Sequence, residues 1–244
     1  DNSSVSEGTH NYCIDNYLDP LGYTYDKVYP AQGGSAADAI ASINGGISML
    51  TFSGHGSTTS WGDMGFNSGH FDQLTNGDML PGVLSHACLT GDFETGTAWC
   101  ETWTRTPERG GLWFWGSVPS SYWDEDDIQQ KGEYDYFLGQ TVYWPMGFLN
   151  GGKLAVYEYY SGGGRTHYYY EAYNLMGDPS VAMAIWGSVG IEGDETPAVG
   201  GNILVNNAVR SAAVVTLSGN GPAELNVFDL PGRLIATPYQ GNLS

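Results

Sequence analysis

Two short segments carry residue types that could act together on a substrate. One is Ser53-Gly-His-Gly56, and the other is His86-Ala-Cys88, which puts Cys88 33 positions after His55. A thiol is a strong nucleophile as its thiolate, and a neighbouring imidazole can take its proton. The backbone N–H groups of Gly56 and Cys88 could then hold an oxyanion. The alternative interpretation is a thiol and a histidine that only pack in the core.

Both segments follow short apolar runs of the kind that form buried strands. Residues 47–52, 82–87 and 112–115 are mostly apolar and each run is followed by a small residue. Such runs are typical of parallel strands that are covered on both faces. Open α/β sheets bind their ligands at the carboxyl ends of the strands. We therefore expect His55 and Cys88 to emerge at the carboxyl edge of one sheet.

Helical patterns alternate with these runs. A capped start at residues 35–38 precedes a helix that ends at Gly45-Gly46, and further helices are expected between Asp92 and Gly110 and around 127–138 and 167–176. A last strand is expected near residues 181–185. Strands that alternate with helices predict an α/β domain with a largely parallel sheet.

The C-terminal region has a different pattern. Short alternating runs at Ile203/Val205, Val214/Thr216 and Leu225/Val227 are separated by turn signals at residues 219–221 and 231–232. This pattern predicts the beginning of a small β-sandwich. Residues 187–200 are rich in Gly and acidic side chains and are typical of a linker. We expect domains at 1–186 and 201–244, joined by a linker at 187–200.

The composition limits the possible partners. Eight Lys and Arg against 27 Asp and Glu give a formal charge of −19, which argues against nucleic acid and anionic membranes and favours cationic ligands. No apolar run approaches the roughly 18 residues of a membrane-spanning helix. The first residue is Asp1, with no signal segment, so we expect a processed or excerpted piece. Its three cysteines, Cys13, Cys88 and Cys100, permit at most one disulfide.

A family resemblance gives these residues a specific interpretation. The run His55-Gly-Ser-Thr-Thr-Ser-Trp-Gly-Asp63 resembles a motif of the gingipain family of cysteine peptidases. The Cys88 segment and residues 117–123 and 166–180 resemble further gingipain segments in the same order. The resemblance implies a caspase-like α/β/α sandwich, a catalytic dyad of Cys88 and His55, and oxyanion donors at Gly56 and Cys88. Thr58 departs from the pattern, which has Glu there.

The same resemblance suggests further site residues. Asp1 begins a turn like the one whose Asp orients the histidine of lysine-cleaving gingipains, and Glu7 is the alternative. The sequence Trp123-Asp-Glu-Asp126 is similar to a segment that lines their primary pocket. This similarity implies that Asp126 meets a substrate Lys and that Trp123 covers its aliphatic stem, with Lys favoured over Arg. The alternative is a solvated acidic loop that caps the next helix.

The resemblance also bears on location, cofactors and partners. Residues 223–237 resemble the Ig-like sorting modules of type IX secretion cargo, which implies a secreted or cell-surface protein. The chemistry needs no cofactor. Gingipain-like proteins bind calcium, so the resemblance is compatible with structural calcium, with its ligands unknown. His86, Cys88 and His70 do not have the spacing of a standard zinc site. The expected partners are polypeptide substrates and the missing upstream part of the same precursor.

The sequence thus predicts a secreted cysteine endopeptidase that cleaves through a thioester, after basic residues. One alternative is a catalytically silent binding or adhesion module that keeps the fold, although the presence of both Cys88 and His55 argues against it. Another is a different thiol hydrolase, such as an amidase or a transpeptidase.

Overall fold

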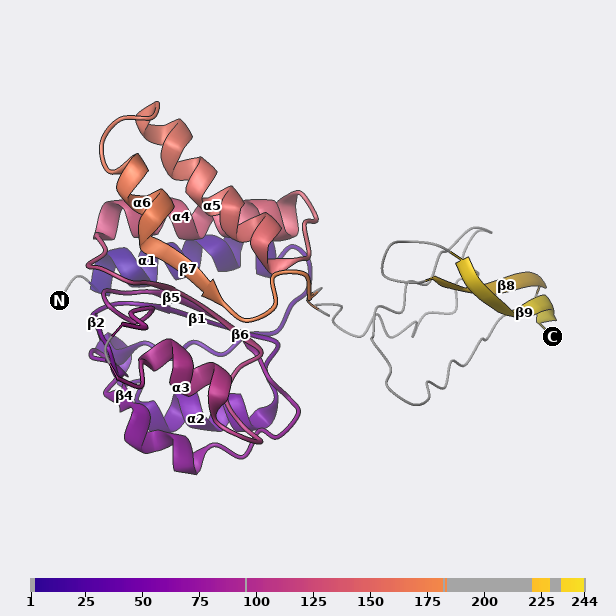
Figure 1. Cartoon of the computed structure of the whole chain (residues 1–244), viewed down its shortest axis with the longest axis horizontal. Helices are drawn as coiled ribbons and strands as arrows, with labels where there is room; N and C mark the ends of the chain where they lie inside the picture. Colours follow the sequence, from indigo (N-terminus) through magenta and orange to yellow (C-terminus); the bar gives the residue numbers. More distant parts are fainter. Residues whose placement is uncertain (1–2, 95, 182, 184–220, 229–233, 244) are drawn as a thin grey trace. The chain divides into compact units, whose positions relative to one another are not determined.

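The computed structural model describes residues 3–94, 96–181, 183, 221–228 and 234–243 (Figure 1). The chain divides into two compact units, Asp1–Thr196 and Pro197–Ser244. The division falls within the linker expected at residues 187–200. Asp1, all of the expected linker and the first two apolar runs of the C-terminal region lie outside the described residues.

A four-stranded sheet forms the centre of the first unit. Its order is β1-β5-β6-β7, where β1 is Met49–Ser53, β5 is Gly82–His86, β6 is Trp113–Ser117 and β7 is Tyr173–Met176. The first three strands are parallel and β7 is antiparallel to β6. The expected strands at residues 47–52, 82–87 and 112–115 and the largely parallel sheet are therefore confirmed.

The last strand lies earlier than the sequence indicated. Val181 and Met183 are outside any strand, and the other residues of the expected strand at 181–185 are not described. The fourth strand is instead β7, which the sequence pattern assigned to the end of a helix. The helix stops at Ala172, because the chain there turns to pair with β6, with Ser117 opposite Tyr173.

Helices cover both faces of the sheet (Figure 1). One layer contains α1 (Ser3–Cys13), α4 (Trp123–Tyr134), α5 (Pro145–Tyr160) and α6 (Thr166–Ala172), and the other contains α2 (Ala36–Gly45) and α3 (Trp99–Arg105). Neighbouring strand residues alternate between two apolar cores, with Leu84, Trp113 and Trp115 in the first and Val83 and Phe114 in the second. The domain is the three-layer α/β/α sandwich that we expected.

Local signals explain α2 but not α5. Ser35 caps α2, its backbone N–H donating to Asp38 at 2.9 Å, and Gly46 ends the helix with φ 88°. In α5, Gly151 and Gly152 lower the helix propensity, and the sequence pattern indicated no helix. Tertiary packing requires these glycines, because a Cβ at Gly151 would lie 2.2 Å from Cγ of Tyr136 on the neighbouring π-helical turn. Helix α1 was also not predicted.

A small antiparallel sheet follows β1. It contains β2 (Gly56–Ser57), β3 (Ser60–Trp61) and β4 (Phe66–Asn67) and leads into the 3-10 helix Ser68–Gln73. A second 3-10 turn spans Pro30–Gln32, and π-helical turns at Ile14–Leu18 and Asp135–Gly139 extend α1 and α4. This small sheet directly continues the segment that carries His55.

The second unit contains a hairpin of two strands, β8 (Gly221–Phe228) and β9 (Leu234–Leu243). The strands are antiparallel, with Gly221 opposite Leu243 and Phe228 opposite Leu234. The expected strand at Leu225/Val227 lies in β8. The Ig-like sandwich remains a prediction, since the other runs that support it lie outside the described residues.

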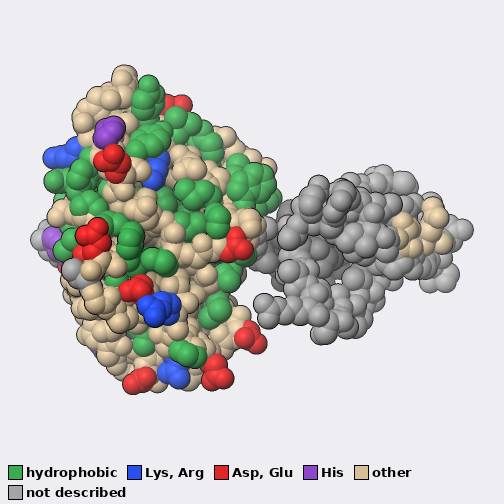
Figure 2. Space-filling model, in the orientation of Figure 1, with side chains coloured by type: hydrophobic (Ala, Val, Ile, Leu, Met, Phe, Trp, Pro, Cys, Tyr) green, Lys and Arg blue, Asp and Glu red, His purple; other side chains and the backbone are tan. Residues whose placement is uncertain are grey.

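The surface carries scattered charges. On the face shown in Figure 2, Lys and Arg side chains lie among acidic ones and do not gather into a basic patch. Within the part of the chain that the structure describes, no helix has both the length and the apolar character needed to span a membrane.

Candidate active site at the carboxyl edge of the sheet

The register of β1 and β5 places the two predicted reactive residues. Ser53 is the partner of His86, and the Gly54 N–H donates to the His86 carbonyl at 3.2 Å. His55 and Cys88 each follow two residues after this pair. Both therefore lie just beyond the carboxyl ends of adjacent parallel strands, where the sequence predicted them.

Gly56 brings the two segments into contact. A Cβ at this position would lie 2.6 Å from the Cys88 carbonyl oxygen and 2.8 Å from Cβ of Ala87. No side chain larger than hydrogen fits there without a shift of the Cys88 backbone. The sequence segment Gly-His-Gly thus has a packing reason, because its second glycine lets the His55 loop close onto the Cys88 loop.

His55 is exposed, and its backbone is fixed by a carboxylate. The His55 N–H donates to Oδ2 of Asp63 at 2.6 Å, from the loop that follows β3. The imidazole meets the half-buried ring of Trp123 edge to face, with ring centroids 5.4 Å apart. The structure therefore brings Trp123, the first residue of α4, to the predicted catalytic histidine.

Cys88 is half-buried, and its sulfur contacts one residue in particular. The Ser121 N–H donates to Sγ at 3.2 Å, and the Ser121 carbonyl oxygen lies 3.6 Å from Sγ. The following residue, Leu89, has φ 62°, a left-handed conformation that costs energy for a branched side chain. The Leu89 N–H donates to the Pro119 carbonyl at 3.1 Å, which holds this turn against the loop at residues 118–122.

The other two cysteines are buried and unpaired. All three cysteines are free thiols. Burial raises the pKa of Cys100 to about 11 and that of Cys13 further. Cys13 and Cys100 are thus inert core residues, and Cys88 is the accessible thiol.

Asp126 lies in the interior beneath the Cys88 loop. Its carboxylate accepts hydrogen bonds from Ser121 Oγ at 2.7 Å, Tyr169 OH at 2.8 Å and Tyr173 OH at 2.6 Å. Burial raises the pKa of Asp126, although nearby His86 and these hydroxyl donors act in the opposite direction. Asp126 is not solvated, as the alternative of a helix cap required, because its side chain is buried and the N-cap residue of α4 is Tyr122. The acidic residues 124–126 do lie in the first turn of α4, as that alternative expected.

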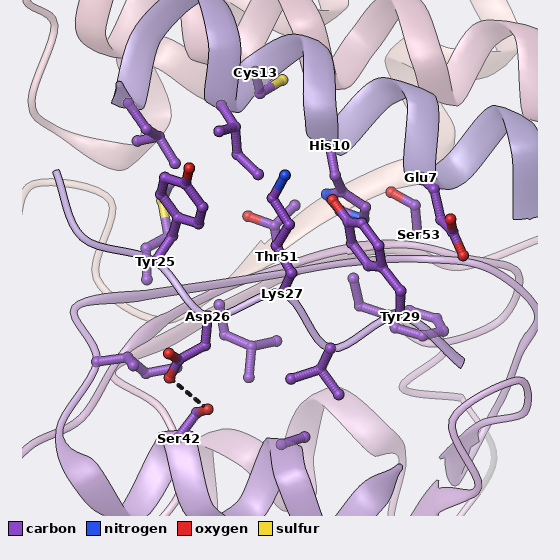
Figure 3. A pocket seen from close by; sticks show the side chains of 18 of the residues that line it. Glu7, His10, Cys13, Tyr25, Asp26, Lys27, Tyr29, Ser42, Thr51 and Ser53 are labelled. Atoms are coloured by element: carbon purple, nitrogen blue, oxygen red, sulfur yellow. Dashed lines mark hydrogen bonds between the residues drawn. The ribbon is translucent and has the colours of Figure 1, made fainter. Parts of the chain in front are cut away.

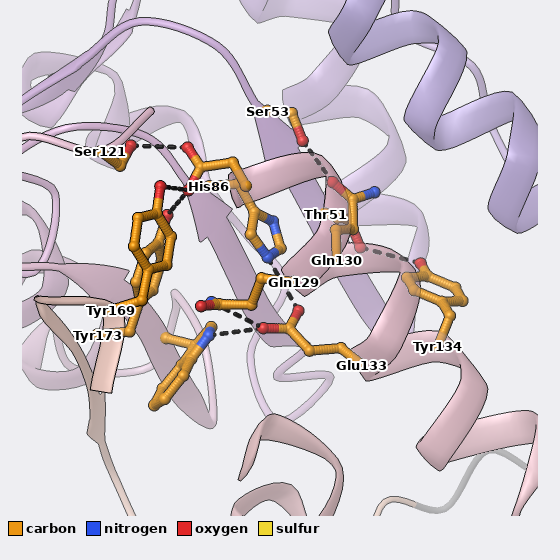
Figure 4. Close-up of polar contacts among 12 residues, drawn as sticks. Thr51, Ser53, His86, Ser121, Gln129, Gln130, Glu133, Tyr134, Tyr169 and Tyr173 are labelled. Carbon is orange, nitrogen blue, oxygen red and sulfur yellow. Dashed lines mark hydrogen bonds and ion pairs between the residues drawn. The ribbon is translucent and has the colours of Figure 1, made fainter. Parts of the chain in front are cut away.

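A second polar group lies deeper, between β5, β6 and α4 (Figure 4). Glu133 forms an ion pair with Nε2 of His86 at 2.9 Å and accepts a hydrogen bond from Nε1 of Trp115 at 2.9 Å. Gln129 Nε2 donates to the same carboxylate at 3.1 Å. His86 therefore has an internal partner at Nε2.

Neither the predicted third catalytic residue nor a metal site is located among the described residues. Asp1 lies outside the described residues, and Glu7, its alternative, accepts a hydrogen bond from Gln32 at 2.9 Å. Among the residues that the structure describes, no three His, Cys, Asp or Glu side chains gather as a metal site. Asp127, in the acidic segment at residues 124–127, binds Lys131 at 2.8 Å. No calcium ligands are assigned.

Figure 3 shows a large groove, whose lining includes neither Cys88 nor His55. It has a volume of about 650 Å³ and is enclosed by α1, residues 22–31 and β1. Polar groups such as His10, Lys27 and Ser53 and apolar ones such as Ile14 line it. The cavity is therefore not the predicted catalytic site, and it borders the edge strand of the sheet.

Three residues of the site were missed by sequence reasoning. Asp63 belongs to the motif that begins at His55, but no role was assigned to it. Ser121 lies in a segment that showed resemblance only as a whole. Tyr169 lies in the helical pattern expected around residues 167–176, and no role in the site was assigned to it. The motif was the only available signal, because the contacts of Ser121 and Tyr169 join segments that are distant in sequence.

Comparison with known proteins identifies the family of this chain. The sequence profile of peptidase family C25 matches residues 3–184. The chain belongs to this family, which confirms the resemblance stated from the motifs.

The chain is similar to Lys-gingipain of Porphyromonas gingivalis, with 28% identity over 203 residues that cover 74% of this chain and 12% of the relative. It is 40% identical to gingipain R1 of the same organism over 88 residues, covering 36% of this chain and 9% of the relative. The solved complex of P. gingivalis RgpB pro- and mature domains has a TM-score of 0.62 at 27% identity, covering 71% of this chain and 43% of that one. The chain spans about an eighth of the length of the Lys-gingipain relatives that it matches.

Proposed function

We propose that this chain carries the catalytic site of a cysteine endopeptidase with Cys88 as nucleophile and His55 as its base. The observation that carries the proposal is the register of β1 and β5, which sets both residues two positions beyond the Ser53/His86 pair. Membership of peptidase family C25 supports the same conclusion. Of the three thiols, Cys88 alone is outside the buried core.

The proposed reaction proceeds in two halves. His55 takes the Cys88 proton, the sulfur attacks the scissile carbonyl carbon, and the C–N bond breaks as His55 protonates the leaving amine. Water then attacks the thioester, which releases the carboxylic acid and restores the thiol. The N–H groups of Gly56 and Cys88 are the proposed oxyanion donors. Asp1 is proposed to orient His55, and no cofactor takes part.

We propose that a basic side chain of the substrate binds between Trp123 and Asp126, with Lys favoured over Arg. Trp123 lies against His55, and Asp126 is linked to Cys88 through Ser121. No ion pair among the described residues engages Asp126. An incoming ammonium would give this buried carboxylate a countercharge, and the flat ring would cover the methylenes.

The dyad is tested by alkylation and by paired variants. Iodoacetamide should label Cys88 much faster than Cys13 or Cys100, as measured by mass spectrometry. Cys88→Ala and His55→Ala should each lower peptide cleavage by about 10⁴-fold, and the double variant should lose little more, because a dyad acts as a unit. His167→Gln, on the exposed side chain of α6, is the matched control. Equal labelling of the three thiols would contradict the proposal.

A peptide panel tests the substrate class and the rival functions. The enzyme should prefer Lys at the cleavage site over Arg, and both over Leu or Asn. Asp126→Asn should raise KM for Lys peptides about tenfold or more, whereas Asp127→Asn, beside it on α4, should not. A binding module would cleave nothing. An amidase would cleave small amides but no internal peptide bond.

We further propose that an upstream strand of the same precursor fills the groove of Figure 3. The Gly82 N–H donates to the Ser48 carbonyl, and the Gly54 N–H donates to the His86 carbonyl. The backbone groups of the even-numbered positions of β1 therefore pair with β5. The backbone groups of Met49, Thr51 and Ser53 then face the groove. Across it, the backbone of residues 24–28 makes no hydrogen bond within the described residues. Two unpaired backbones that border one groove favour an inserted strand.

The chain path supports the same occupant. Helix α1 borders the groove and begins at the same end of the domain as β2 (Figure 1). A strand parallel to β1 would end where α1 begins, which gives a strand–helix unit of the usual kind. It would also lead Asp1 toward the end of the sheet that carries His55.

We propose secretion or display at the cell surface for the whole precursor, from the resemblance at residues 223–237.

Hydrogen exchange tests the strand. In a longer chain that includes the precursor residues before Asp1, the amides of Met49, Thr51 and Ser53 should exchange at least about tenfold more slowly than in the 244-residue chain. The amides of Leu50 and Phe52, which face β5, serve as the internal control. Unchanged exchange at the three groove-facing amides would exclude this occupant.

A further inference from the structure

We propose that the loop at residues 118–122 is a positioning element for the nucleophile, and that Tyr169 of α6 and Asp126 of α4 hold this loop in place. The proposal rests on the proposed role of Cys88 and assigns residues that act through Ser121. It adds a device that the motifs do not indicate, because it joins β5, α4 and α6 around one sulfur atom.

The sulfur of Cys88 receives a backbone donor from this loop. The Ser121 N–H points to Sγ at 3.2 Å, and the Ser121 hydroxyl lies 4.0 Å from the same atom. A backbone N–H that donates to sulfur stabilises a thiolate more than a neutral thiol. It also fixes the side-chain rotamer, so that the sulfur does not swing away from the edge of the sheet.

Helix α6 secures both ends of the loop. The Val118 N–H donates to the Ala172 carbonyl at 2.8 Å, and Tyr168 OH donates to the Ser120 carbonyl at 2.5 Å. Tyr169 OH accepts from the Tyr122 N–H at 2.8 Å and lies 3.0 Å from the Tyr122 carbonyl oxygen. The backbone on both sides of Ser121 is thus bound to consecutive tyrosines of one helix.

Asp126 links the same helix to Ser121 itself. Its Oδ2 accepts from Ser121 Oγ at 2.7 Å, and its Oδ1 accepts from Tyr169 OH at 2.8 Å and Tyr173 OH at 2.6 Å. The tyrosine rings stack with centroids 5.6 Å apart, and both are fully buried. Buried hydrogen-bonded groups of this kind move little, so the position of Ser121 is fixed by the core rather than by the solvent.

The test compares two tyrosines that are neighbours on α6. Tyr169→Phe keeps the ring and removes the hydroxyl, and it should lower the rate of Cys88 alkylation by iodoacetamide at neutral pH about tenfold. Peptide cleavage should lose a similar factor in kcat with KM changed less than about twofold. Tyr170→Phe, whose ring is 45% exposed, is the matched control and should change neither rate.

Ser121 provides a second, independent comparison. Ser121→Ala removes the link to Asp126 and should slow Cys88 alkylation, whereas Ser121→Thr retains a hydroxyl and should restore most of the rate. If Tyr169→Phe unfolds, Cys13 and Cys100 become labelled and the Ser121 pair decides. Equal Cys88 rates in Ser121→Ala and Ser121→Thr, or in Tyr169→Phe and Tyr170→Phe, would overturn the proposal. Since alkylation needs no peptide, a chain that cleaves nothing but shows these differences would contradict the proposed function alone.

Discussion

The two faces of the central sheet are built from different chemistry. Under α2 and α3, the core is aromatic, with Trp61, Trp99, Trp103, Phe66 and Phe71 in mutual contact at centroid distances such as 5.4 Å for Trp61–Trp99 and 5.1 Å for Phe71–Trp103. Under the other four helices, the core also contains many aromatic rings but encloses charged side chains. These include His86, Glu125, Asp126, Glu133 and Lys153.

The two faces have different roles: one holds the segment after His55 in place by packing, and the other contains the ionisable groups near the Cys88 loop. The aromatic face holds the small sheet after His55, because Trp61 of β3 packs in it and donates to Ser85 Oγ of β5 at 2.8 Å. Its stability depends on burial and shape. The polar face contains the groups next to the Cys88 loop, and their energies depend on ionisation. Burial, for example, lowers the pKa of Lys153 to about 8. Substitutions on the two faces should therefore give different responses to pH.

The largest expected effect comes from the aromatic face. Trp61→Ala should lower the free energy of unfolding by about 3–5 kcal/mol, because it leaves a cavity among large rings. It also removes the indole donor of the Ser85 hydroxyl, which keeps only its hydrogen bond to Thr90. Urea unfolding measures this loss, which should be the same at pH 6 and pH 8. Tyr159→Ala, at a side chain that is 69% exposed, should change stability by less than about 0.5 kcal/mol. A small loss for Trp61→Ala would show that the aromatic face is not the main support.

A smaller effect is expected from the polar face. Glu133→Gln keeps the volume and a hydrogen-bond acceptor for Trp115 but removes the ion pair with His86. We expect a loss of about 2–3 kcal/mol in the free energy of unfolding, because buried polar partners are left incompletely matched. Glu158→Gln, at an exposed position of α5, is the matched control. If the two variants were equally stable, the ion pair would contribute nothing.

The smallest expected effect is the dependence of the free energy of unfolding on pH. Burial lowers the pKa of His86, but the Glu133 carboxylate outweighs it, so the folded-state pKa is raised above 6.5. A raised histidine pKa means that this stabilisation is complete below the unfolded-state pKa and is lost as pH rises through the folded-state pKa. Unfolding of the unmodified protein from pH 6 upward should show this decline, with a slope of at most about 1.4 kcal/mol per pH unit. The Glu133→Gln variant should lose less stability over the same pH range. An identical loss in the variant would show that other titratable groups cause the pH dependence.

Local patterns in the sequence were sufficient for part of the fold. The runs that became β1, β5 and β6 are short and apolar, and their alternation with helices indicated a parallel sheet. The cap at Ser35 and the stop at Gly46 were also readable, because both depend on neighbouring residues alone. The pairing of His55 with Cys88 at one edge followed from strand direction, which needs no knowledge of side-chain contacts.

Long-range contacts decided the rest. Helix α5 forms across Gly151 and Gly152 because close packing rewards their small size, and β7 replaces a helical pattern because β6 offers it backbone partners. Each of these choices depends on the free energy of contacts between distant segments, which local propensity does not contain.

The sequence by itself determined the class of chemistry, since the residue types at His55 and Cys88 and the strands before them are local properties. Only the tertiary structure decided what surrounds these residues. It placed Ser121 on the sulfur, Trp123 against the imidazole and Asp126 beneath both, with two tyrosine hydroxyls on its carboxylate. The physical reason is that a hydrogen bond or a ring contact requires positions within a few ångströms, and only the packing of the helices on the sheet fixes those positions.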